Sequence, residues 1–202
     1  MGKVWNFLWK SNNPLSWILD IVLIFLVVKF ILFPVAGAIF ATNMPFVIVE
    51  SGSMTHGMLK DVHGMWTICD NVSSSKVSVE NFEKYWSFCG KWYEEKNISK
   101  EEFSQYWSFL NGFNKGDIVV VKGSKDYKKG QVIIFRVPGQ STPIIHRIVS
   151  VRQNGNVFST KGDHNPGQLA QEMEIDKSQI IGKAISRIPS LGWVKLIFVG
   201  KF

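Results

Sequence analysis

The sequence has little charge, few cysteines and no recognisable metal-binding spacing. Charged residues make up only 19% of the 202 residues, and cysteine occurs twice. The four histidines are scattered, without a CxxC or HxxxH spacing, so we expect no metal site, zinc included, and no organic cofactor. No run of lysine and arginine with interleaved aromatic residues occurs, so nucleic acid binding is not expected despite the net charge of +7.

A long apolar run follows the N-terminus and predicts a membrane anchor at residues 15–42. Its part Ile21–Ala41 is as long as a spanning helix requires, about 20 residues. A cleavable signal peptide is the alternative, but its apolar core is shorter. Lys3 and Lys10 precede the run without an acidic residue, so the positive-inside rule keeps residues 1–14 in the cytoplasm and exports the rest.

The exported part is predicted to be a mostly β domain made of residues 43–60 and 115–202. Residues 116–202 hold thirteen basic and six acidic residues, a bias that suits the surface of an anionic membrane lipid. Runs rich in valine and isoleucine, bounded by glycine or proline, predict its strands. They lie at 44–50, 116–123, 130–137, 143–160 and 180–189, the fourth being a hairpin that turns at Asn154-Gly155. The C-terminal segment 190–202 is too short to span a membrane, and we expect a last core strand or a segment at the lipid interface.

Residues 61–114 differ in character and predict a helical, aromatic-rich insert. Aromatic and apolar residues recur there at helical spacing, at 82, 85, 86 and 89 and again at 103, 106, 107 and 110. The two faces either pack on each other, cover a site as a lid, or touch lipid headgroups. Cys69 and Cys89 both lie in the insert, and the sequence leaves open whether they are bridged. Asn71 and Asn97 each begin a glycosylation sequon.

Two serines follow the first predicted strand, in the stretch Ser51-Gly52-Ser53-Met54. The stretch is either a plain turn or a serine nucleophile presented at a strand end. A nucleophile needs a base, and His146 shares a strand face with apolar residues, where a neutral imidazole can serve. Asp163 follows the second strand of the hairpin and is expected to orient His146 as the acid of a triad, or else only to form a turn.

Four ordered motifs together resemble the type I signal peptidases. They are the serine stretch at 51–54, Gly-Asp-Ile-Val-Val at 116–120, Ile-His-Arg-Ile-Val at 145–149 and Thr-Lys-Gly-Asp-His-Asn at 160–165, all after a membrane anchor. The histidine, in place of the lysine of bacterial members, makes the chain similar to the archaeal and endoplasmic-reticulum branch. The resemblance implies a signal-peptidase-like β fold and a membrane-bound serine endopeptidase that removes signal peptides from exported preproteins, which carry small residues at positions −1 and −3.

The resemblance also implies a role for each matching residue. Ser53 is the expected nucleophile, His146 the general base and Asp163 the acidic partner. Ser51 is expected to supply an oxyanion-hole hydroxyl beside the Ser53 backbone N–H, and Met54 to line the pocket for position −1. The substrates are preprotein signal peptides, and the sequence leaves open whether other subunits are needed.

The chain departs from the pattern of this family at three places. His56 stands where proline is usual, the insert separates the first two motifs, and Leu169 stands where this branch usually has a second acid. Possible substitutes for that acid follow it, at Glu172, Glu174 and Asp176.

Two other interpretations remain. One is a serine–lysine peptidase of similar fold with Lys122 or Lys161 as the base. The other is a membrane-anchored, non-catalytic β domain for binding or scaffolding. The membrane is expected to be that of an archaeal cell or of the endoplasmic reticulum.

Overall fold

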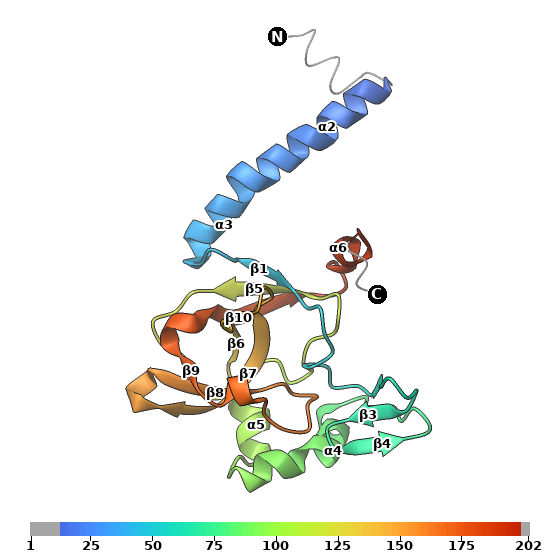
Figure 1. Ribbon diagram of the computed structural model, residues 1–202, viewed down its shortest axis with the longest axis vertical. Coiled ribbons are helices and arrows are strands. Elements are labelled where there is room, and N and C mark those ends of the chain that lie inside the picture. The colour runs from blue at the N-terminus through green and yellow to red at the C-terminus, as the bar shows by residue number, and fades with distance from the viewer. Residues whose placement is uncertain (1–12, 199–202) are drawn as a thin grey trace. The chain divides into compact units, whose positions relative to one another are not determined.

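A computed structural model describes residues 13–198 of the chain (Figure 1). The chain divides after Pro45 into an N-terminal unit and a larger unit that begins at Phe46. Lys3 and Lys10, on which the predicted orientation depends, lie outside the described residues, as do residues 199–202 of the C-terminal segment.

The N-terminal unit is a continuous helix from Pro14 to Phe40. It consists of α2 (Pro14–Val27), a π-helical turn η1 (Val28–Leu32) and α3 (Phe33–Phe40). Asn13 caps its start, since its side chain accepts a hydrogen bond from the backbone N–H of Leu15. The π turn ends two residues before Pro34, which has no N–H with which to continue the α-helical pattern. The helix has 27 residues and a stretch of mean hydropathy 2.7, so by length and composition it can cross a membrane.

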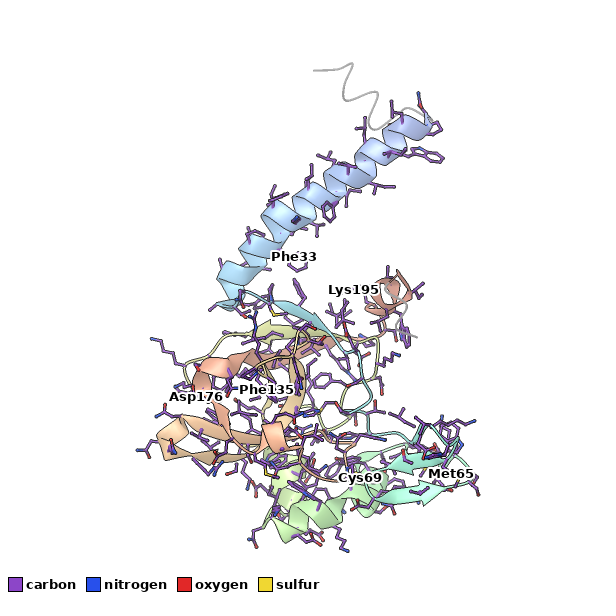
Figure 2. All side chains as sticks on the ribbon, viewed as in Figure 1. Phe33, Met65, Cys69, Phe135, Asp176 and Lys195 are labelled. Atoms are coloured by element: carbon purple, nitrogen blue, oxygen red, sulfur yellow. A yellow bond between two sulfur atoms is a disulfide. The ribbon has the colours of Figure 1, made fainter. Side chains whose placement is uncertain are left out.

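The larger unit is built around one curled, seven-stranded antiparallel sheet (Figure 1). Its strand order is β1-β5-β10-β6-β7-β8-β9. The bounds are β1 (Phe46–Ile48), β5 (Ile118–Lys122), β6 (Val132–Phe135), β7 (Ile144–Arg152), β8 (Val157–Lys161), β9 (Ile175–Asp176) and β10 (Ile180–Ile188). The predicted mostly β fold is therefore confirmed, and each predicted strand run contains an observed strand. Phe135 and other buried apolar side chains form the core enclosed by the curled sheet (Figure 2).

The predicted hairpin is formed by β7 and β8, which turn through Gln153–Gly155. Asn154 and Gly155 both have positive φ, 52° and 84°, which is the backbone conformation that an Asn-Gly turn supplies. The alternation of residues along β7 places His146 and Arg147 on opposite faces of the sheet. This separation decides where their partners lie.

The insert contains both helices and a small sheet. Its helices are α4 (Phe82–Glu95) and α5 (Lys100–Tyr106), capped by the side chains of Asn81 and Ser99. Before them lies a three-stranded sheet that the aromatic periodicity did not indicate. Its first strand, β2 (Leu59–Lys60), directly precedes the predicted insert, and β3 (Trp66–Ile68) and β4 (Asn71–Ser73) belong to the insert. The second helix ends earlier than its aromatic pattern suggests, because the chain is extended at Trp107.

The insert has its own aromatic core, closed by a disulfide. Cys69, in the turn between β3 and β4, is bonded to Cys89 of α4, with 5.5 Å between the two Cα atoms. Around them pack Tyr85, Tyr93 and Phe103, each with no exposed surface. The aromatic faces of the two helices thus pack together, as one of the sequence interpretations held.

The chain ends its described part in a short helix, α6 (Trp193–Phe198). The alternative of a last core strand is therefore wrong. Gly192 donates a backbone hydrogen bond to Gly116, and the bulky indole of Trp193 packs directly against that glycine. Leu196 is buried, whereas Val194 and Ile197 are exposed.

Candidate active site

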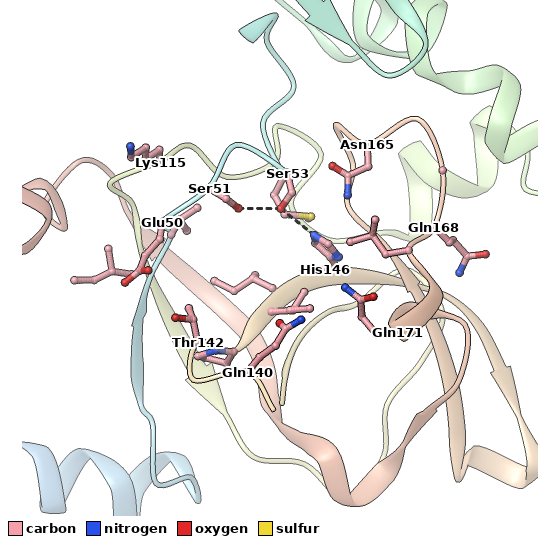
Figure 3. Close-up of a pocket in the computed structure, with 18 of the residues that line it drawn as sticks. Glu50, Ser51, Ser53, Lys115, Gln140, Thr142, His146, Asn165, Gln168 and Gln171 are labelled. Carbon is pink, nitrogen blue, oxygen red and sulfur yellow. Dashed lines mark hydrogen bonds between the residues drawn. The ribbon is translucent and has the colours of Figure 1, made fainter. Parts of the chain in front are cut away.

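Ser53 and His146 lie within hydrogen-bonding distance at the edge of a cleft (Figure 3). The distance from Ser53 Oγ to His146 Nε2 is 2.9 Å, although the two residues are 93 positions apart in the chain. Ser53 is half-buried, and only 3% of the surface of His146 is exposed. A hydroxyl facing an imidazole at this distance is the arrangement in which the ring can accept the hydroxyl proton.

The sequence explains how the serine reaches this position. β1 ends at Ile48, and the chain then turns, with the Thr55 N–H donating to the Gly52 carbonyl at 2.9 Å. A second hydrogen bond fixes the turn, since the His164 N–H donates to the carbonyl of Ser53 at 2.8 Å. The serine side chain is therefore presented on a backbone that is fixed on both sides.

A buried glutamate holds the other side of the imidazole. His146 Nδ1 is hydrogen-bonded to the carboxylate of Glu172, which is fully buried at the end of the 3₁₀ turn η3 (Ala170–Glu172). The same carboxylate accepts hydrogen bonds from the Leu169 N–H at 2.7 Å and from Thr160 Oγ1 at 3.3 Å. A carboxylate placed in this way fixes the tautomer and the orientation of the ring and leaves Nε2 free to accept a proton.

The two other acids that follow Leu169 do not reach the histidine. Glu174 is exposed and lies 3.4 Å from Arg152, and Asp176 caps the 3₁₀ turn η4 (Lys177–Gln179). Of the three acids considered from the sequence, Glu172 is thus the one that the fold brings to His146.

The structure corrects the expectation that Asp163 orients His146. The carboxylate of Asp163 is fully buried and forms a two-pronged pair with Arg147, at 2.9 Å from Nε and 2.6 Å from Nη2. The reason is strand alternation. Lys161 lies opposite Arg147 in the sheet, so Asp163, two residues later, falls on the Arg147 side and away from His146.

His56 completes this buried cluster. Its Nε2 lies 2.8 Å from Asp163 Oδ2, and its ring stacks on Tyr85 with 3.7 Å between the ring centres. Gly112, at φ 61°, permits the packing, because a Cβ there would collide with the His56 ring and with the Met54 carbonyl. His56 replaces the proline of the family pattern, and its role was not recognised from the sequence.

The cluster fixes the charges of its members. Burial by itself raises the pKa of Asp163, but the charge and hydrogen bonds of Arg147, with a smaller contribution from His56, outweigh burial and hold that pKa far below its ordinary value. Burial lowers the pKa of His56, and the neighbouring Asp163 only partly compensates. We therefore take Asp163 as charged and His56 as neutral in the folded protein at neutral pH.

The neutral His56 predicts a loss of stability in mild acid. The pKa of His56 lies below 6.5 in the folded protein and near 6.5 in the unfolded chain. At a pH between these two values the unfolded chain binds more protons than the folded protein. The free energy of unfolding therefore falls as the pH falls through about 6.5. The low pKa of Asp163 acts in the same direction, but only below about pH 4. His56→Gln keeps a donor to Asp163 but does not titrate. Between pH 7.5 and pH 5, its melting temperature is expected to fall less than that of the wild type. Equal drops would contradict this assignment.

Neither of the two lysines considered as alternative bases is hydrogen-bonded to Ser53 in the described part of the chain. The Nζ of Lys161 donates to the carbonyl of Gly162 at 3.0 Å and lies among the rings of Trp92 and Tyr93. Burial lowers the pKa of this lysine to about 8, yet it lies on the Arg147 face of the sheet. Lys122 is exposed on β5. The geometry thus favours His146 over both lysines.

The cleft beside Ser53 has a volume of about 920 Å³. Ser51 Oγ lies 3.2 Å from Ser53 Oγ, and Met54 lines the cleft from a position with 1% exposure. Apolar side chains of β1 and β7, Ile48, Ile144 and Ile145, form part of the lining, and the loop 165–171 closes the side next to His146 (Figure 3). Among residues 13–198, no group of three or more His, Cys, Asp or Glu side chains is arranged to hold a metal ion.

Part of this site lies in a segment that is similar to known peptidases. Residues 105–185 match the model of the family described as Peptidase S24-like. The human protein named signal peptidase complex catalytic subunit SEC11C is 30% identical over 95 residues, which cover 42% of this chain and 50% of that protein. The SEC11 subunit of Eremothecium gossypii is 31% identical over 96 residues, 42% of this chain and 57% of that protein. The predicted resemblance to signal peptidases is confirmed.

The similarity to signal peptidases covers only part of each chain. The chain spans about half the length of the curated relatives that it matches, the sec11 subunit of Dictyostelium discoideum included, with 27% identity over 101 residues and 54% of that protein. The family match at 105–185 contains His146, Asp163 and Glu172 but begins after Ser53 and does not include it. The role of Ser53 therefore depends on its geometry and on the resemblance of the motif at 51–54.

Proposed function

We propose that this chain is a membrane-anchored serine endopeptidase that cleaves N-terminal signal peptides from exported preproteins. The observation that carries the proposal is the contact between Ser53 Oγ and His146 Nε2 at 2.9 Å, with Nδ1 of the same ring held by the buried Glu172. The names of the SEC11 relatives support the same activity.

The three side chains divide the proton transfers between them. His146 takes the proton of Ser53 as the oxygen attacks the carbonyl carbon of the scissile bond, and later gives it to the leaving amine. Glu172, bonded to the other ring nitrogen, stabilises the imidazolium that forms in between. Water, activated by the same histidine, then hydrolyses the acyl-enzyme and frees Ser53.

Negative charge that develops on the substrate carbonyl needs donors near Ser53. The backbone N–H of Ser53 and the hydroxyl of Ser51 are the groups that we assign to this role, because Ser51 Oγ lies 3.2 Å from the nucleophilic oxygen. Ser51 is exposed, so a peptide in the cleft can reach its hydroxyl.

The cleft suits an extended peptide with small side chains near the cleaved bond. Its apolar lining by Met54, Ile144 and Ile145 surrounds the position next to Ser53. We propose that small residues at positions −1 and −3 bind here, in agreement with the A-x-A pattern of signal peptide cleavage sites.

The membrane is the place where such a substrate becomes accessible. We propose that the helix Pro14–Phe40 spans the bilayer once, with the N-terminus in the cytoplasm and the β domain outside it, in contact with membrane lipid. The SEC11 relatives are named as subunits of a complex, so partner subunits are part of the proposal.

The direct test is cleavage of a preprotein with an A-x-A site by the purified full chain in liposomes. The wild type is expected to release the mature protein with the new N-terminus directly after the second alanine. A substrate with arginine at position −1 is the matched control and is expected to remain uncut. Equal processing by the wild type and by Ser53→Ala would sink the proposal and favour the non-catalytic binding domain.

The two sequons offer a test of the orientation. Asn97 is exposed between α4 and α5, whereas Asn71 is half-buried and its side-chain amide donates to the Phe88 carbonyl at 2.9 Å. If the β domain is translocated, synthesis in the presence of endoplasmic-reticulum microsomes is expected to add a glycan at Asn97. The added mass should disappear in Asn97→Gln and persist in Asn71→Gln. A protease-accessible, unglycosylated domain would show the opposite orientation.

A further inference from the structure

The insert lies behind the catalytic serine and contributes nothing to the cleft. Among the described residues that line the cleft, none falls between positions 55 and 114. A lid over the site is therefore not what the geometry supports. The insert instead contacts the segment Gly162–Asn165, on the side away from the substrate.

Three hydrogen bonds join the insert to this segment. Tyr85 donates its hydroxyl to the Asp163 carbonyl at 2.9 Å, and the Cys69 N–H donates to the His164 carbonyl at 2.9 Å. Tyr93 donates to Asp163 Oδ1 at 3.3 Å. Both tyrosines and Asp163 are fully buried, so these bonds have no competition from water.

The same segment holds the serine and the imidazole in place. The His164 N–H donates to the Ser53 carbonyl at 2.8 Å, and the His164 ring contacts the Thr55 carbonyl at 3.1 Å. Gly162 packs so closely that an added Cβ would lie 2.9 Å from the Ser53 carbonyl and 2.7 Å from His146 Nε2. A shift of this segment would therefore move both reacting groups.

The disulfide fixes the part of the insert that makes these contacts. Cys69 lies in a tight turn with φ 51°, and its bond to Cys89 ties the turn to the helix that carries Tyr85 and Tyr93. One covalent link thus holds the Cys69 N–H and the two tyrosine hydroxyls as a single rigid set of donors.

We propose that the insert is a positioning element for the nucleophile: Tyr85, Tyr93 and the Cys69–Cys89 disulfide hold the segment 162–165, and that segment sets the place of Ser53 against His146. The inference rests on the proposed peptidase function. Because none of these residues touches the substrate cleft, weakening them should lower the rate of the chemical step and leave substrate binding unchanged.

The test measures two samples against the untreated wild type. One is the variant Tyr85→Phe, and the other is the wild type after its disulfide has been reduced with dithiothreitol. Each sample is measured well below its melting temperature. The value of kcat is normalised to the concentration of Ser53 that reacts with a serine-directed fluorophosphonate. We expect kcat and the rate of Ser53 phosphonylation to fall about tenfold in Tyr85→Phe, the loss that one buried hydrogen bond commonly brings, with KM nearly unchanged. A further loss is expected on reduction.

Trp86→Phe is the matched control. Trp86 belongs to the same helix and the same aromatic core, but its indole donates to Glu94 at 3.1 Å and not to the segment 162–165. It is expected to lower the melting temperature without changing kcat. If Tyr85→Phe and reduction leave kcat unchanged, or if all variants lose activity in proportion to their stability, the positioning role is overturned. A wild type that neither cleaves preprotein nor reacts at Ser53 would instead contradict the proposed function itself.

Discussion

The variants Ser53→Ala and His146→Ala are each expected to lose activity to the limit of detection, a fall in kcat of about 10⁶-fold. Each removes one member of a unit that transfers a single proton, since Ser53 Oγ and His146 Nε2 face each other at 2.9 Å. For the same reason the double variant should be no worse than either single one. The measurement is the single-turnover rate of preprotein cleavage in liposomes.

Glu172→Gln is expected to lose about 10⁴-fold in kcat while binding substrate normally. The amide can donate a hydrogen bond to His146 Nδ1, which favours the tautomer whose Nε2 carries the proton and cannot accept one from Ser53. Glu174→Gln is the control, because that exposed carboxylate contacts only Arg152 among the ion pairs of the described residues. If Glu172→Gln retained wild-type kcat, the acid would have to be sought elsewhere.

Replacing Arg147 by methionine is expected to lower the free energy of unfolding by about 3–5 kcal/mol, since it leaves the charge of Asp163 buried without its main partner. Both side chains are completely buried, and the guanidinium also donates to the Gly130 carbonyl at 3.0 Å. Urea unfolding of the full chain in detergent measures the effect.

Two further variants make the prediction for Arg147→Met specific. Arg152→Met removes an exposed arginine of the same strand and should change the free energy of unfolding by less than about 0.5 kcal/mol. Arg147→Met combined with Asp163→Leu should recover part of the lost stability, because it removes the unpaired charge as well. An Arg147→Met protein as stable as the wild type would show that the buried pair contributes little to the fold.

The sequence was sufficient to propose Ser53 and His146 as a pair, because short motifs and strand alternation carry that information, and the fold brings the two side chains to 2.9 Å. Ser53 follows a strand and precedes Met54, and His146 shares a face with Ile144 and Ile148, so the two positions could be proposed without coordinates. The main strands were predictable for a similar reason, since runs of valine and isoleucine bounded by glycine mark them clearly.

The carboxylate that contacts His146 was not predictable in the same way. Leu169 occupies the position where the family pattern suggests it, and the reach of Glu172 to His146 depends on the 3₁₀ turn that ends there. Asp163 was assigned to the wrong partner, because its place beside Arg147 follows from the pairing of Arg147 with Lys161, a register that the sequence alone does not give. The small sheet of the insert escaped prediction because its strands are only two or three residues long.

The separation of Ser53 from its partners along the chain also determines when the site can exist. Ser53 precedes His146 by 93 residues, and His146 precedes Glu172 by another 26. Contacts between such distant positions form late in folding, after the loops between them have closed. During synthesis, the hydroxyl of Ser53 therefore emerges without its imidazole partner, and the contacts among Ser53, His146 and Glu172 cannot all form until the strands through β8 and the turn that ends at Glu172 have followed.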